Sequence, residues 1–169
     1  MSEQVSRLAV QHLRKKMFPL LPSEIQKTFP LISDPLVEDD NKVPKIVVGT
    51  LTEYGANTAT PAITVNCEGE ADGIVNVYRH LLLHVDIWAG GNIASNVDGR
   101  RFVSIVYQHV FDALQNINWS GRGGSPNTDY VQVERCYETQ RSAIMFEPAQ
   151  KIYHIANTYR VEALCQTWY

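Results

Sequence analysis

The sequence predicts an α+β fold in which a mainly antiparallel sheet of about five strands packs against a long helix and an N-terminal helix. Three observations support this: segments of period-two alternation, two helical segments, and strands both before and after the longer helix. The chain has 169 residues, 44% hydrophobic and 20% charged, which is typical of a globular protein. We therefore expect one domain over 1–169, with an N-terminal helix (1–18), a proline-rich arm or loop (19–44) and a sheet plus the long helix (45–169).

The first segment predicts an amphipathic helix that ends at Pro19. Residues that recur at steps of three and four share one of its faces: Val5, Leu8, Ala9, His12, Leu13 and Met17. Five prolines then fall between 19 and 44, together with an acidic run at 38–40. This stretch predicts an extended arm or long loop with a short helical turn around Ser23 to Thr28. It is either a surface connection or an arm that reaches a neighbouring subunit.

Alternating apolar residues predict strands on both sides of the long helix. Three are expected before it, from about Ile46 to Thr52, over Ala62–Glu68, and from about Ile74 to Trp88. Two more are expected after it, where Val131, Val133 and Arg135 share one face, and later over 159–165.

The third strand has one aliphatic face and one mixed face. The aliphatic face, which should pack on the long helix, consists of Leu81, Leu83, Val85 and Ile87. The mixed face, which we expect to be only partly covered, consists of His80, Leu82, His84, Asp86 and Trp88.

The long helix is predicted from about Asn96 to Ile117. Ser95 and Asp98 fit a capping box, with Asp in place of the usual Glu or Gln. Apolar residues cover so much of the helix circumference that only a narrow polar stripe remains. We therefore expect the helix to be covered on more than one side, by its own chain or by a second subunit. The glycine-rich stretch from Ser120 to Asp129 predicts a loop that leads into the next strand.

The sequence predicts no catalytic, cofactor or metal site. His80 and His84 have the spacing of two zinc ligands on a helix, but four residues of a strand span about 13 Å. The three cysteines form no CxxC pair and indicate reduced, mostly buried thiols: Cys67, Cys136 and Cys165. The stretch Gly121–Gly124 lacks both the GK[ST] sequence and the strand-to-helix context of a phosphate loop. We predict neither stoichiometric zinc nor turnover that depends on His80, His84 or Cys67.

The charge balance disfavours non-specific binding to nucleic acid, because the net charge is −3. The densest basic clusters are short, at Arg14–Lys16 and Arg100–Arg101. The first predicts a solvated helix face and the second a surface or subunit contact. No apolar run approaches the ~20 residues of a membrane span, and the N-terminus has no hydrophobic signal core. We therefore expect a cytoplasmic protein without a membrane partner.

Four segments occur in a characteristic order: the strand end Val85–Trp88, then Arg100–Arg101, the amphipathic helix to Ile117, and a closing strand with Tyr159–Val161. Together they resemble the tail terminator, or tail-completion, proteins of long-tailed bacteriophages. In that family a Val-Asp-x-Trp strand end precedes a polar link, a long helix, a variable loop and a terminal pair of strands. The match covers residues 78 to 169, and the proline-rich segment departs from the family's compact pattern.

The resemblance implies a non-enzymatic virion protein of the tail neck, assembled in the host cytoplasm without a cofactor. It implies a ring, typically of six copies, that caps the tail tube protein, ends tube growth and offers a docking surface to the head connector or completion proteins. Viral DNA would pass through the lumen without specific binding. Arg100, Arg101 and Arg122 are candidate contacts with an adjacent subunit or the tube. Two alternatives stay open: another phage neck component, such as a head-completion or adaptor protein, and a small cytoplasmic α+β enzyme.

Overall fold

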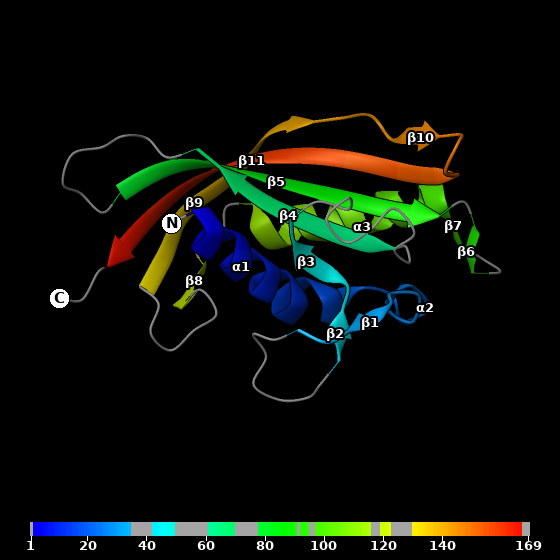
Figure 1. Cartoon of the computed structure of the whole chain (residues 1–169), viewed down its shortest axis with the longest axis horizontal. Coiled ribbons are helices and arrows are strands. Elements are labelled where there is room, and N and C mark those ends of the chain that lie inside the picture. The colour runs from blue at the N-terminus through cyan, green and yellow to red at the C-terminus, as the bar shows by residue number, and fades with distance from the viewer. Residues whose placement is uncertain are drawn as a thin grey trace.

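The computed structural model describes residues 2–34, 42–49, 61–69, 78–90, 92–94, 97–115, 119–122 and 130–166. The sheet strands are β3 (Ile46–Val48), β4 (Ala62–Glu68), β5 (Tyr78–Gly90), β8 (Trp119–Arg122), β9 (Tyr130–Arg141), β10 (Met145–Glu147) and β11 (Ile152–Gln166). They form a seven-stranded sheet in the order β3-β4-β5-β11-β9-β8, with β10 paired to β11 (Figure 1). Because β3 runs parallel to β4 and the other pairs are antiparallel, the fold is α+β with a mixed sheet.

The helices lie near the start and the middle of the chain. They are α1 (Ser2–His12), α2 (Ser23–Gln26) and α3 (Gly99–Leu114). The first helix was predicted to end at Pro19, but its α-helical part ends at His12. The chain then continues as a π-helical segment η1 (Leu13–Met17) and a 3-10 turn η2 (Phe18–Leu20), which contains the proline. Two short ladders complete the described chain: β1 (Leu31–Ile32) with β2 (Val43–Pro44), and β6 (Asn92–Ala94) with β7 (Val97–Asp98).

The core lies between the sheet and the two longer helices. The predicted aliphatic face of β5 is buried, since Leu81, Leu83, Val85 and Ile87 are each no more than 1% exposed. Helix α3 packs against β5 and β11, which confirms the predicted contact between this face and the long helix. Helix α1 packs against β3 and β4 at one edge of the sheet and also against β8 at the other. The sheet therefore curves around α1 (Figure 1).

The start of the long helix differs from the prediction. Asp98, and not Ser95, caps α3, because its Oδ1 accepts a hydrogen bond from the Arg101 amide at 2.7 Å. The two residues before the helix form β7 and have extended backbone, so the helix begins three residues later than expected. It ends at Leu114, where Gln115 takes an extended conformation. Ser95 and the predicted last residues, 116–117, lie outside the described part of the chain.

The broad apolar surface of α3 is covered by its own chain. One side packs on the sheet and another on η1, while the Phe102 ring lies 5.4 Å from that of Phe29. Toward β9, the Tyr107 hydroxyl donates to Glu138 and accepts from Arg141, each at 2.8 Å. The sequence left two possibilities for what covers this helix, its own chain or a second subunit. Its own chain covers it, so the helix by itself does not require a second subunit.

The prediction of an extended arm over 19–44 is wrong for its first half. Residues Phe18–Ile32, named here the N-terminal hook, fold back onto the core and bury Leu21, Ile25 and Phe29. These residues recur every four positions around the short helix α2, which confirms the predicted turn near Ser23. The hook then pairs with β2, which closes the segment onto the same chain. The acidic run at 38–40 lies outside the described residues.

Several strands differ from the prediction in extent and in number. Strand β4 has the predicted bounds, whereas residues 50–52 and 74–77 lie outside the described ranges. The predicted loop from Ser120 begins as strand β8, which pairs with the start of β9. Arg135 does not share the buried face of Val133, because a register shift in β9 adds one residue between them. The sheet thus has seven strands, where about five were expected.

His12 connects α1 to the end of α3 and makes stability depend on pH. Its Nε2 lies 2.9 Å from the Ala113 carbonyl oxygen, and its ring stacks on Trp119 with centroids 5.6 Å apart. Burial lowers the pKa of His12 from 6.5; the hydrogen bond to Ala113 opposes this shift, and the charge of Lys16 adds to it. The unfolded chain therefore takes up this proton at a higher pH than the folded chain does.

We expect stability to fall below about pH 6.5, the unfolded pKa of His12, and to keep falling through its lower folded value. Urea unfolding of the parent and of His12→Gln, at about pH 7.5 and about pH 5, measures this effect. The other histidines are common to both proteins, so the smaller loss expected in His12→Gln isolates His12. An equal loss in both proteins would contradict the assignment.

Candidate functional site

The sheet has one buried face and one face that is only partly covered, called here the open face. At its β4 side Ala62 and Thr64 are themselves buried. Along β5 the inward residues are buried, whereas His84, Asp86 and Trp88 are partly exposed and Leu82 is 43% exposed. This confirms the predicted mixed face. Strands β4 and β11 continue it on both sides, because their residues pair with β5 in register. An antiparallel sheet packed on one side commonly leaves such a face to solvent or to a partner.

Three histidines of the open face each lie near a carboxylate from a neighbouring strand. The pairs are His80 with Glu162 (3.8 Å), His84 with Glu68 (3.6 Å) and His154 with Asp86 (3.6 Å). Each is an ion pair only when its imidazole is protonated. The first two pairs each have one well-exposed member, so screening limits each of them to about 1 kcal/mol or less, whereas His154 of the third pair is buried. The pairs align neighbouring strands and do not concentrate charge of one sign.

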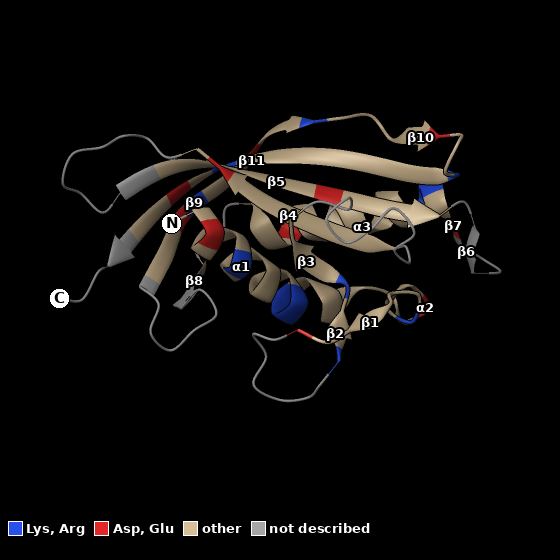
Figure 2. Ribbon diagram, viewed as in Figure 1, with Lys and Arg blue, Asp and Glu red and all other residues tan. Residues whose placement is uncertain are grey.

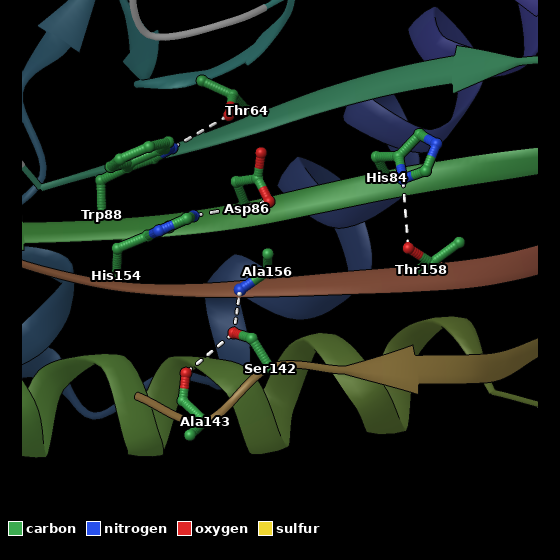
Figure 3. Close-up of polar contacts among 9 residues, drawn as sticks. All are labelled: Thr64, His84, Asp86, Trp88, Ser142, Ala143, His154, Ala156 and Thr158. Atoms are coloured by element: carbon green, nitrogen blue, oxygen red, sulfur yellow. Dashed lines mark hydrogen bonds and ion pairs between the residues drawn. The ribbon is translucent and has the colours of Figure 1, made fainter. Parts of the chain in front are cut away.

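An aromatic stack lies on the open face. The rings of Trp88 and His154 lie parallel, with centroids 3.8 Å apart and planes 7° apart. Trp88 Nε1 donates to Thr64 Oγ1 at 3.0 Å, and His84 Nδ1 lies 3.1 Å from Thr158 Oγ1 (Figure 3). These contacts connect β4, β5 and β11 across the face. Alternation along β5 placed Trp88 on this face, whereas His154 can be placed beside it only from the register of β11.

The histidines do not converge on a shared point. His80 and His84 lie on the same face of strand β5 and pair separately, with carboxylates from different strands. Within the described residues, no group of three or more His, Cys, Asp or Glu side chains could hold a metal ion. Cys67 and Cys136 are free and buried. Burial raises the pKa of each thiol to about 12, so both are protonated and unreactive near neutral pH.

The three predicted contact arginines do not lie together. Arg100 and Arg101 are exposed in the first turn of α3, where Figure 2 shows basic residues beside β7 at one end of the molecule. Arg122 is the last residue of β8, which lies toward the other end (Figure 1). The Arg122 side chain is outside the described part of the structure. The structure thus separates the candidates into two different surfaces.

Exposed apolar side chains form a second set of surface features, and of these only Leu82 was expected from the sequence. Among the described residues, the large hydrophobic side chains that are exposed are Leu20 (72%), Leu31 (60%), Phe146 (46%), Leu82 (43%) and Met145 (41%). Leu82 was expected on the mixed face. One feature of the sequence could have identified Met145 and Phe146 as exposed: they are two consecutive apolar residues in a short segment without helical or strand periodicity. The exposure of Leu20 and Leu31 follows from the fold of the hook.

No protein-family model matches the chain, and no curated protein sequence matches it. Within the described residues, no helix is long and apolar enough to cross a membrane.

Proposed function

We propose that this chain is a tail terminator protein of a long-tailed bacteriophage. In this role it forms a ring, of six copies by the resemblance, on the last ring of the tail tube. The ring stops tube growth and gives the head connector a surface on which to dock, while DNA passes through its lumen. The net charge of −3 suits this last role, because a strongly basic lumen would bind the phosphates and retard the DNA.

The observation that carries the proposal is the packing of the resembling segments into one unit. The Val85–Trp88 end of β5 leads, through a short connection, to α3, which packs back on the same strand. The closing segment Tyr159–Val161 of β11 pairs in register with Leu81–Leu83 of β5. The order of elements that suggested the family is thus also a contiguous arrangement in space, which supports the resemblance.

A closed ring of identical subunits requires contacts between two different surfaces of the subunit. An isologous contact, in which one surface meets its own copy, would stop at a dimer. A non-closing contact would polymerise without limit and could not mark the end of a tube. Arg100 and Arg101 lie at one end of the subunit, and the strand that carries Arg122 lies toward the other. This separation suits a closed ring, in which two different surfaces of the subunit meet.

We expect the double variant Arg100→Glu/Arg101→Glu to fold normally and to lose ring formation or tube capping by about tenfold or more. Folding should persist because both residues lie in the first turn of α3, where carboxylates interact favourably with the helix dipole. Native mass and thermal melts of parent and variant measure the two effects. Arg160→Glu, an exposed charge reversal on the sheet, is the matched control and should assemble like the parent.

Tube length tests the function directly. The tail tube protein is polymerised with and without the purified chain, and tube lengths are measured by electron microscopy. A terminator shortens or fixes the length distribution and leaves one tube end unable to elongate. Unchanged lengths together with binding to the head connector would favour the neck-component alternative, and unchanged lengths without any binding would remove both structural roles.

A further inference from the structure

Half of the buried side-chain polar atoms that lack a hydrogen-bond partner in the described chain belong to two residues of β11. They are Nδ2 and Oδ1 of Asn157 and the hydroxyl oxygen of Tyr159; the other three are nitrogens of Arg14, Trp119 and His154. Asn157 is 1% exposed and Tyr159 is fully buried. Residues two apart on a strand point to the same side, so both side chains lie on the buried side of β11, where α3 packs.

Asn157 differs from the single nitrogens because the whole polar end of its side chain is unpaired. Arg14 donates through another of its nitrogens to Asp34, and His154 Nε2 lies 3.6 Å from the Asp86 carboxylate. A buried amide without partners loses its hydrogen bonds to water on folding and gains none in return. Folded proteins leave few such groups. A partner from outside the chain would remove this cost.

Polar side chains of β9 and α3 lie beside the two buried residues. Arg141 and Glu138 are the register partners of Asn157 and Tyr159, so each shares its partner's side of the sheet. Residues three apart on a regular strand point to opposite sides, and the bulge in β9 is what brings Glu138 and Arg141 to the same side. The Tyr107 hydroxyl of α3 donates to Glu138 and accepts from Arg141. These three residues thus satisfy one another next to the unpaired atoms.

The chemistry of the site favours a small neutral group that both donates and accepts hydrogen bonds. Burial raises the pKa of the Tyr159 hydroxyl, and the charge of Glu138 raises it further. The hydroxyl therefore stays protonated and needs an acceptor, while Asn157 needs partners for both its donor and its acceptor atom. The Arg141 charge disfavours a cation here, and the Glu138 carboxylate disfavours an anion. Water meets these requirements and makes about three hydrogen bonds when it is buried.

We propose that ordered water molecules bind between α3 and β11, with hydrogen bonds to the Asn157 amide and the Tyr159 hydroxyl. They connect these two side chains to the Glu138 carboxylate, so the hydrogen-bonded cluster at Tyr107 continues from the surface into the core. The contact between α3 and the sheet is then hydrated at this point and apolar elsewhere. This site belongs to the single subunit and does not depend on the proposed ring.

Nuclear magnetic resonance of the full chain detects such waters directly. Cross-relaxation in the laboratory and rotating frames has opposite signs for a water that stays bound and equal signs for one that exchanges quickly at the surface. We expect signals of opposite sign at the Asn157 side-chain amide and not at that of Asn66, a partly exposed asparagine on β4. Asn157→Leu should lose the first signal and keep the second, which assigns both.

The stability of Tyr159→Phe depends on whether water binds the hydroxyl. If water is bound, the variant loses a hydrogen bond, and we expect its unfolding equilibrium constant to rise about fivefold. If the hydroxyl is unpaired, its removal relieves a cost and the variant is at least as stable as the parent. Urea unfolding measures the difference. The inference is overturned by a parent without the bound-water signal at Asn157, or by a Tyr159→Phe protein that is no less stable than the parent.

Discussion

Leu83→Asp is expected to leave no folded protein at room temperature. Leu83 is fully buried in the middle of β5, in register with Cys67 on β4 and Tyr159 on β11, both also buried. A carboxylate at this position would have no cationic partner and would either remain charged in an apolar core or take up a proton. Either outcome costs several kcal/mol, a large share of the ~5–15 kcal/mol that stabilises an ordinary domain.

The neighbouring residue provides a matched control. Leu82→Asp makes the same chemical change one position earlier on the same strand, but on the open face, where Leu82 is 43% exposed. We expect this variant to express and melt close to the parent. Circular dichroism melts of the three proteins measure the contrast. If Leu83→Asp melted like the parent, the assignment of the core to this face of β5 would be wrong.

Gly99→Ala is expected to destabilise the fold by about 3 kcal/mol, because it adds one methyl group where the backbone leaves no room. Gly99 begins α3 against the end of β5, and a Cβ there would lie 2.0 Å from the Gly90 carbonyl oxygen and 2.8 Å from Cδ2 of Tyr153. The ring of Tyr153 can turn, but the carbonyl belongs to the strand backbone. The start of the helix must therefore move away from the sheet, which loses contacts along both elements.

A second glycine, Gly69, serves as a control, because replacing it by alanine causes no steric clash. Gly69 has a φ of +85° but open space where a Cβ would lie. Gly69→Ala should therefore cost only the backbone strain of an alanine at positive φ, about 1 kcal/mol. Urea unfolding compares the two variants with the parent. A Gly99→Ala protein no less stable than Gly69→Ala would show that the helix start does not contact Gly90 as described.

The parts of the fold that the sequence predicted are those governed by local periodicity. Alternation along β5 gave the correct buried and open faces, because successive side chains of a strand point to opposite sides. Strand β4 has the predicted bounds, since Gly69 follows it directly and ends the alternation. The helical turn near Ser23 was also predicted, although the stretch around it shows little periodicity.

The parts that failed depend on contacts between distant residues. The bulge that exposes Arg135 appears only when β9 is paired with β11, so alternation in β9 alone assigned the residue to the wrong face. Proline content suggested an arm, yet Leu21, Ile25 and Phe29 bind the hook to the core. The Ser95 cap was a local pattern, but β7, which pairs with β6, extends to Asp98, so Asp98 is the N-cap and the helix starts at Gly99.

For the candidate surfaces, too, the sequence predicted local features and not those that depend on contacts between distant residues. Sequence clusters identified Arg100 and Arg101 as exposed, because consecutive arginines in a first helical turn rarely pack inward. The stack of Trp88 on His154 required the register between β5 and β11. The exposure of Leu20, Leu31, Met145 and Phe146 required the complete fold, since exposure is defined by what the rest of the chain leaves uncovered.

Imaging of tube ends tests whether the chain caps a tail tube as a closed ring. Tail tubes are incubated with an excess of the parent protein, freed of unbound chain and imaged by electron cryomicroscopy, with averaging of the tube ends. We expect one additional ring at a single end of each tube, with the same subunit number at every capped end and an open lumen. Bare ends on every tube, with the parent monomeric by native mass in the same mixture, would contradict it.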